Sequence, residues 1–137
     1  MTVELNKLEK RKLTKSLVSQ VKQSQRAKLA LESQLNMLQM QLQRLKDSGL
    51  MDGVADTEER IACLEWDVLK NKLFLTRYER VMTYFKEENE FDFYAFKYRY
   101  EDCLTLDAIE AKVGYSPNTI TRRTDKMLDE FLYLMRC

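Results

Sequence analysis

The scarcity of helix-breaking residues constrains this chain more than any other feature of its sequence. One proline and three glycines are spread over 137 residues. Proline removes an interior hydrogen bond from a helix, and glycine is the least favourable of the other residues there. Leucine, methionine, lysine, arginine, glutamate and glutamine, which all favour helices, dominate the composition. The sequence therefore predicts an all-α fold.

A leucine repeat organises the first part of the chain. The segment from Glu4 to Lys46 contains no glycine or proline and is predicted to form one long helix. Leucines recur there in alternating steps of four and three residues, the heptad spacing of a helix that packs along another helix. Earlier in the same register stand Lys28 and Ser24, so the seam is strongly apolar only in its C-terminal half. The seam leucines are Leu31, Leu35, Leu38, Leu42 and Leu45.

A second long helix is predicted after a linker at residues 47–56, which holds two of the three glycines. Asp56 is a suitable N-cap, because its carboxylate can accept from backbone N–H groups, and Glu59 follows at the spacing of a capping box. The helix is expected to run from about Thr57 to about Lys86 with apolar residues on two sides. One side comprises Ile61, Leu64, Val68, Leu75, Tyr78, Met82 and Phe85, and the other comprises Trp66, Leu69, Leu73 and Phe74.

A helix that is apolar on two sides needs more than one packing partner. The simplest arrangement is an antiparallel hairpin of the two long helices that leaves one surface for a second subunit, so we expect a homodimer formed through these helices. Asn71 in the seam is interpreted as a partly exposed asparagine rather than as a device that sets the register. Residues 1–87 are expected to form this stalk, and residues 88–137 a separate small domain.

Aromatic residues crowd residues 91–100 and are interleaved with two basic residues. Such a mixture can bind single-stranded nucleic acid by base stacking. Phe93, Phe96 and Tyr100, however, stand at helical spacing, and a helix-turn-helix needs a third helix to close its core. We therefore predict that these three rings pack beneath the C-terminal unit.

The C-terminal unit has the marks of two short helices joined by a tight turn. Thr105 is suited to cap the first helix, and Gly114 is suited to end it in a left-handed conformation. Ser116 is then placed to cap the second helix, and Pro117 fits its first position because the missing N–H would have no helical partner. Two short-linked helices with a glycine in the turn are a helix-turn-helix signature.

The second of these helices carries side chains suited to DNA. In a helix-turn-helix, the N-terminal residues of the second helix reach base edges in the major groove. Arginine pairs with guanine, asparagine pairs with adenine, and threonine can contact a polar edge or the thymine methyl. The alternative is an ordinary helical hairpin with a solvated polar face. On the DNA interpretation, the base contacts are Asn118, Thr121 and Arg122, and the phosphate contacts are Ser116, Thr119, Arg123 and Lys126.

The segment from Thr105 to Phe131 resembles the promoter-reading C-terminal region of bacterial sigma factors. It differs at Pro117 and Asn118, where sigma factors usually carry charged residues, and at Arg123, where they bury an apolar residue. The chain as a whole resembles small late-gene transcription regulators of phages of Gram-positive bacteria, the ArpU and RinA type, which share a Gly-Tyr-Ser turn. The residues that carry the sigma resemblance are Thr105, Leu106, Ile109, Gly114, Ser116, Ile120, Lys126 and Leu128.

The resemblance implies a sequence-specific regulator that binds double-stranded DNA, activates phage or prophage late genes and contacts host RNA polymerase. Two other functions remain open from the sequence. Small terminase subunits, which package phage DNA, also join a helix-turn-helix to a helical oligomerisation region. The chain could also be a coiled-coil interaction module that binds no DNA.

Composition argues against an enzyme, a cofactor and a metal site. The three cysteines are far apart and the chain has no histidine, so neither zinc spacing nor a Cys-His nucleophile is present. No glycine-rich phosphate loop occurs, and no apolar run approaches the length of a membrane span. With no signal-peptide core at the N-terminus, we expect a soluble intracellular protein, and the resemblance implies the cytoplasm of a bacterial host cell.

Charge is unevenly distributed along the chain. Residues 1–46 hold ten lysines and arginines against three acidic residues, although the net charge of the whole chain is only +1. This basic segment could contact phosphates, form the solvated face of a coiled coil, or bind an acidic surface of its own protein.

Overall fold

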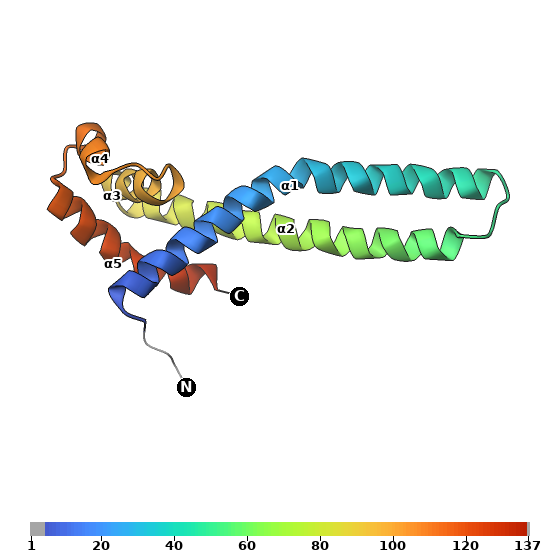
Figure 1. The fold of residues 1–137 in the computed structure, drawn as a ribbon, viewed down its shortest axis with the longest axis horizontal. Helices are drawn as coiled ribbons and strands as arrows, with labels where there is room; N and C mark the ends of the chain where they lie inside the picture. The colour runs from blue at the N-terminus through green and yellow to red at the C-terminus, as the bar shows by residue number, and fades with distance from the viewer. Residues whose placement is uncertain (1–4, 137) are drawn as a thin grey trace. The chain divides into compact units, whose positions relative to one another are not determined.

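A computed structural model describes residues 5–136, and every regular element in that range is helical, which confirms the predicted all-α fold (Figure 1). Two long helices are followed by shorter ones. The elements are α1 (Lys7–Asp47), α2 (Val54–Glu88), α3 (Glu90–Phe96), the π-helical segment η1 (Lys97–Glu101), α4 (Leu106–Val113) and α5 (Pro117–Met135).

The long helices begin at positions that differ from the sequence prediction. α1 is capped by Asn6, whose Oδ1 accepts from the Glu9 N–H at 2.8 Å, and the expected start at Glu4 lies outside the described residues. α2 begins at Val54, so Asp56 lies in its first turn rather than at the N-cap. The Thr57 N–H donates to the Gly53 carbonyl at 2.9 Å, and Val54 is buried, so helical pairing starts earlier than the carboxylate suggested.

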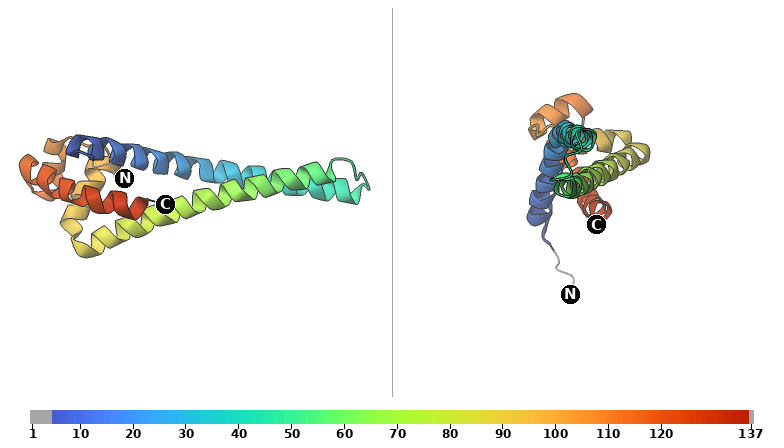
Figure 2. Two further views of the ribbon diagram at one scale, coloured as in Figure 1. Left: turned by 90° about the horizontal axis from the view of Figure 1, so that it is seen from below. Right: turned by 90° about the vertical axis from the view of Figure 1, so that its right-hand side faces the viewer.

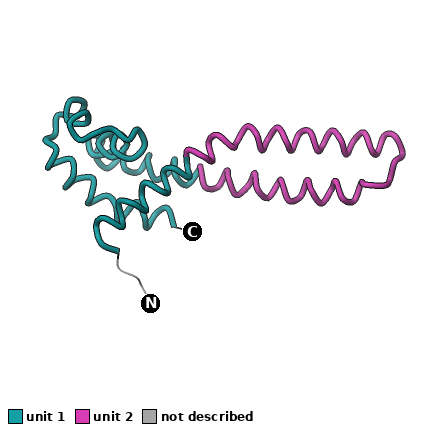
Figure 3. The backbone as a smooth tube through the Cα atoms, in the orientation of Figure 1, with its two compact units in different colours: residues 1–21, 76–137 teal, residues 22–75 magenta. Residues whose placement is uncertain are grey.

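The chain divides into two compact units, one formed by residues 1–21 and 76–137 and one by residues 22–75 (Figure 3). The predicted boundary between residues 87 and 88 falls inside the first unit. α2 does end at Glu88, beside this boundary, but buried side chains on both sides of the boundary belong to one unit. Val18 of α1 and Val81 and Phe85 of α2 are buried in the same unit as α5.

The second unit is an antiparallel helical hairpin, with its α1 and α2 segments side by side in both views (Figures 1 and 2). All five seam leucines of α1 are half-buried, as are Leu64 and Val68 of α2, whereas Ile61 is buried. The Asn71 Nδ2 donates to the Ser24 carbonyl at 3.1 Å. The heptad seam is therefore used within the chain, and Asn71 is half-buried with a specific partner that helps to set the register.

An aromatic cluster forms the main core of the first unit. The Phe131 ring is fully buried, with centroids 5.2 Å from Phe96, 6.4 Å from Tyr78 and 6.5 Å from Phe85. Phe96 also lies 5.5 Å from Phe85 and 4.9 Å from Tyr100. Large rings at these separations supply much of the apolar burial of a small domain. α5 is thereby fixed to α2 and to the end of α3.

A second, smaller cluster closes the helix-turn-helix. Ala95 of α3, Ile109 of α4 and Ile120 of α5 are fully buried together. Phe93, Phe96 and Tyr100 are also buried, which confirms the prediction that they are core residues. α3 is thus the third helix that α4 and α5 need. The π-helical turn after it and the left-handed Cys103, with a φ of 54°, were not anticipated.

Candidate nucleic-acid interface

The turn between α4 and α5 has the predicted capping geometry. Thr105 caps α4 by accepting from the Ala108 N–H at 3.2 Å, and Gly114 ends that helix with a φ of 81°. Ser116 caps α5 by accepting from the Thr119 N–H at 3.3 Å, and Pro117 begins the helix. These local signals set where α5 starts, and hence which side chains occupy its first turns.

Gly114→Ala is expected to lower the free energy of unfolding by about 1 kcal/mol, because the left-handed backbone strains an L side chain. A Cβ at this position would meet nothing within 4 Å, so the cost comes from the backbone alone. Gly114→Asn should cost less, since asparagine tolerates this conformation. Urea denaturation monitored by far-UV circular dichroism measures both changes. Equal losses for the two variants would contradict the conformational explanation.

The predicted base-reading residues differ in exposure. Asn118 and Arg122 are exposed on the first turns of α5, whereas Thr121 is half-buried. Within residues 5–136, no hydrogen bond or ion pair engages the Arg122 guanidinium. Asn118 and Arg122 are four residues apart and therefore lie on the same face of the helix, one turn from each other. An unengaged asparagine and arginine on one face can both reach the same groove.

The predicted phosphate contacts fall into two groups. Lys126 is exposed one turn beyond Arg122. The Ser116 Oγ and Thr119 Oγ1 share a hydrogen bond at 2.9 Å within the cap. Arg123, in contrast, is half-buried and pairs with Asp92 of α3 at 3.2 Å, and its guanidinium lies over the Tyr115 ring at 4.9 Å. The structure thus gives Arg123 a role in joining α3, the turn and α5, in place of the predicted phosphate contact.

Acidic residues further along α5 are paired with the start of α1. The Arg11 Nε donates to the Asp125 Oδ1 at 2.9 Å, with a second guanidinium bond to the Oδ2, and Lys10 pairs with Asp129 at 2.6 Å. The side chain of Asp125 is only 5% exposed. Three roles were considered for the basic N-terminal segment. Lys10 and Arg11 take the third of them, because they bind acidic residues of the same chain.

Asp125 also belongs to a partly buried network with η1. The Arg99 Nη1 donates to the Thr124 Oγ1 at 2.6 Å and lies 3.5 Å from the Asp125 carboxylate. Burial alone would raise the pKa of Asp125, but the hydrogen bonds from Arg11 and the charges of Arg11 and Arg99 outweigh it and lower that pKa. The carboxylate is consequently ionised at neutral pH, with its charge compensated by two guanidinium groups.

Sequence reasoning missed two basic residues that matter here. Arg11 was counted in a basic segment but not linked to α5, because the contact joins residues 114 positions apart. Lys112 is exposed in the last turn of α4, with its ammonium 5.4 Å from the centre of the Tyr98 ring. In helix-turn-helix proteins the first helix crosses the DNA backbone, so a lysine at this place is a further candidate phosphate contact. Its position two residues before Gly114, in the last helical turn, was the available signal.

Other kinds of site have little support in the described part of the chain. A groove of about 840 Å³ lies between the two helices of the second unit and is lined by mixed polar and apolar side chains, including Met37, Gln41, Arg60 and Cys63. Residues 5–136 contain no cluster of three or more potential metal ligands. Nor does any helix in that range combine the length and apolar character that a membrane span requires.

Comparisons of the chain with protein-family models, with curated proteins and with solved structures found no match.

Proposed function

We propose that this protein is a sequence-specific DNA-binding transcription regulator whose α5 enters the major groove of double-stranded DNA. The observation that carries this proposal is the exposed pair Asn118 and Arg122 at the start of α5, which follows a capped helix-turn-helix connection. Asparagine and arginine present the hydrogen-bonding patterns that distinguish adenine and guanine. In this proposal, Thr121 makes a secondary base contact from its half-buried position.

Charge compensation along α5 supports the same proposal. Two carboxylates on a recognition helix would repel DNA phosphates, but Asp125 and Asp129 are each paired with a basic residue of α1. The exposed Lys126 and Lys112 lie on α5 and α4 and provide charges that suit phosphates. Ser116 and Thr119 can add hydroxyl contacts at the N-terminus of α5. Arg123 is left out of this set because Asp92 already engages it.

The biological setting comes from the resemblance to phage late-gene regulators. On that basis the protein acts in the cytoplasm of a bacterial host, activates late genes of a phage or prophage, and brings host RNA polymerase to their promoters. The two clusters of the first unit hold α5 rigidly, as positioning on base edges requires.

Arg122→Ala is expected to weaken binding to the preferred DNA site by about 1–3 kcal/mol and to relax base choice at one position. The preferred site is obtained by repeated selection from a pool of random-sequence duplexes, and affinities are measured by fluorescence anisotropy at several salt concentrations. Lys126→Ala should instead weaken binding to all sequences by a similar factor and reduce the salt dependence. Arg26→Ala, which removes an exposed arginine from the hairpin unit, is the matched control and should change neither quantity.

The selection also separates the proposal from its alternatives. Enrichment of one sequence by the wild type but not by the Asn118→Ala/Arg122→Ala double variant supports base readout by α5. Enrichment that survives the double variant places the specificity elsewhere. Binding without enrichment would favour a packaging role, and no binding at all would favour a protein-interaction module.

A further inference from the structure

A second apolar stripe on α2 remains exposed after the hairpin has formed. Trp66, Leu69 and Leu73 are 59%, 44% and 57% exposed, and the exposed Ala62 precedes them. The four residues are separated by steps of four, three and four, so they form a continuous heptad stripe. The seam leucines of α1 pack on the opposite side of α2, towards Ile61 and Leu64. An exposed tryptophan followed by two exposed leucines in one line is typical of an interaction surface.

Charge along α2 indicates what covers this stripe. Residues 56–67 carry a clear excess of acidic side chains, whereas residues 70–80 carry an excess of basic ones. A second copy of the same helix laid antiparallel on the first brings each acidic half against a basic half. A parallel copy places like charges side by side along the whole stripe. Two-fold symmetric contacts need such a self-complementary surface, and this one has it.

We propose that the chain forms a homodimer in which the Ala62–Leu73 stripes of two α2 helices pack antiparallel about a two-fold axis between Trp66 and Leu69. In this register, Trp66 packs against Leu69 of the second copy, and Ala62 packs against Leu73 of the second copy. Glu65 and Lys72 flank the same side of the stripe and lie opposite each other across the interface, twice by symmetry. The seam that the leucine repeat predicted as an interface is used within the chain, so the dimer uses the other side of α2.

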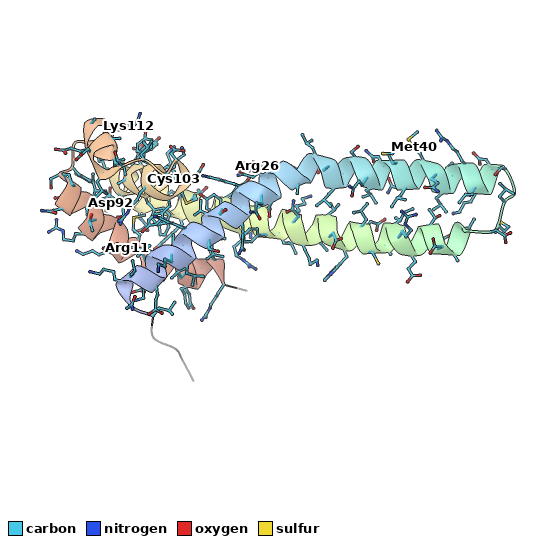
Figure 4. The ribbon with its side chains drawn as sticks, in the orientation of Figure 1. Arg11, Arg26, Met40, Asp92, Cys103 and Lys112 are labelled. Atoms are coloured by element: carbon cyan, nitrogen blue, oxygen red, sulfur yellow. The ribbon has the colours of Figure 1, made fainter. Side chains whose placement is uncertain are left out.

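Sedimentation velocity from low to high micromolar concentration tests the surface. The wild type is expected to shift from monomer to dimer with concentration, and Trp66→Glu to raise the dimer dissociation constant by about 30-fold or more, since it places a charge in an apolar contact. Met40→Glu is the matched control, because Met40 is 57% exposed on the outer side of α1, away from α2 (Figure 4). Circular dichroism should show the wild-type helix content for both variants. A wild type that stays monomeric, or equal effects of the two variants, overturns the proposal.

Disulfide cross-linking tests the orientation. In a background with Cys63, Cys103 and Cys137 replaced by serine, Glu65→Cys combined with Lys72→Cys should give covalent dimers on mild oxidation, and each single variant should not. Within one helix the two positions are about 10 Å apart, beyond the reach of a disulfide, so the bond must join two chains.

Ala62→Cys, introduced as the lone cysteine, reports on the other orientation. In the antiparallel register, two copies of position 62 lie about 16 Å apart along the helix axis, whereas a parallel pair places them opposite each other in the apolar stripe. Cross-linking through Ala62→Cys without cross-linking of the double variant would overturn the antiparallel arrangement. Both experiments are done without DNA, so their outcome does not depend on the proposed regulator function.

Discussion

Phe131→Ala is expected to lower the free energy of unfolding of the first unit by about 3–5 kcal/mol, the largest effect of any change considered for this chain. The ring is fully buried, and its three aromatic neighbours come from α2 and from the segment at the end of α3. Removing it leaves a cavity that rigid aromatic neighbours cannot fill. A domain of this size has only about 5–15 kcal/mol of stability in total, so the loss is a large fraction.

Measuring this loss needs a probe that reports on the first unit, where Phe131 lies. Trp66, the only tryptophan, lies in the hairpin unit, so its fluorescence does not report on the core around Phe131. Amide hydrogen exchange read by mass spectrometry over α5 and the end of α2 does report on it. Phe91→Ala is the matched control, because that ring is 62% exposed and its loss should cost less than about 1 kcal/mol. Unchanged protection of α5 in Phe131→Ala would show that the aromatic cluster does not hold this helix.

Arg11→Met is expected to destabilise the first unit by about 2–4 kcal/mol at neutral pH. The substitution leaves the carboxylate of Asp125 buried without its main partner, and breaking such a pair usually costs about 3–5 kcal/mol. Two features reduce the cost here, because Arg99 remains 3.5 Å away and the side chain of Arg11 is itself 29% exposed. Urea denaturation, followed through hydrogen exchange of α5, measures the difference. Lys10→Met is the control, since its partner Asp129 is 74% exposed and the pair should contribute at most about 1 kcal/mol.

The pH dependence of this difference provides a second test. The folded-state pKa of Asp125 is lowered below its ordinary value of 3.8, so the stabilisation by the pair is complete above pH 3.8 and is lost as the pH falls through the folded-state value. In Arg11→Met, burial should raise the pKa of the same carboxyl, which can then take up a proton and avoid a buried charge. The difference in free energy of unfolding between the wild type and Arg11→Met should therefore become smaller as the pH is lowered from 7 towards 3. A difference that stays constant with pH would point to lost packing of the arginine side chain instead.

A double substitution separates the buried charge from the loss of the pair itself. Arg11→Met combined with Asp125→Asn removes both charges, and it should cost less than Arg11→Met alone because no carboxylate is left buried. If the double variant loses as much free energy of unfolding as the two single variants lose together, the two side chains contribute independently. Such a result would contradict the interpretation of Arg11 as the counter-charge that allows Asp125 to stay ionised on α5.

Much of the local structure could be predicted from short-range chemistry. Thr105, Gly114, Ser116 and Pro117 act through the backbone within a few residues, and each has the expected role at a helix end. The heptad leucines predicted the paired helices for a similar reason, because their spacing depends only on the geometry of one helix. The exposure of Asn118 and Arg122 also followed from helical periodicity.

Other features depended on contacts that join distant parts of the chain. The sequence could not show that Arg123 pairs with Asp92, that Arg11 reaches Asp125, or that the first turns of α1 belong to the same unit as α5. An arginine on a helix surface looks alike whether it faces solvent, a carboxylate or a phosphate. Only the folded structure decides which of these is within reach.

The amino-acid sequence by itself thus determined the helical class, the helix ends around the turn and the face of α5 that is exposed. These depend on backbone capping and on side-chain periodicity, which act over one or two turns. The tertiary structure decided which charges are neutralised within the chain, which apolar stripe of α2 is used inside the hairpin, and where the chain divides into units. Those outcomes depend on burial and on Coulomb interactions between residues far apart in the sequence, whose strength is set by distance and solvent exposure in the folded state.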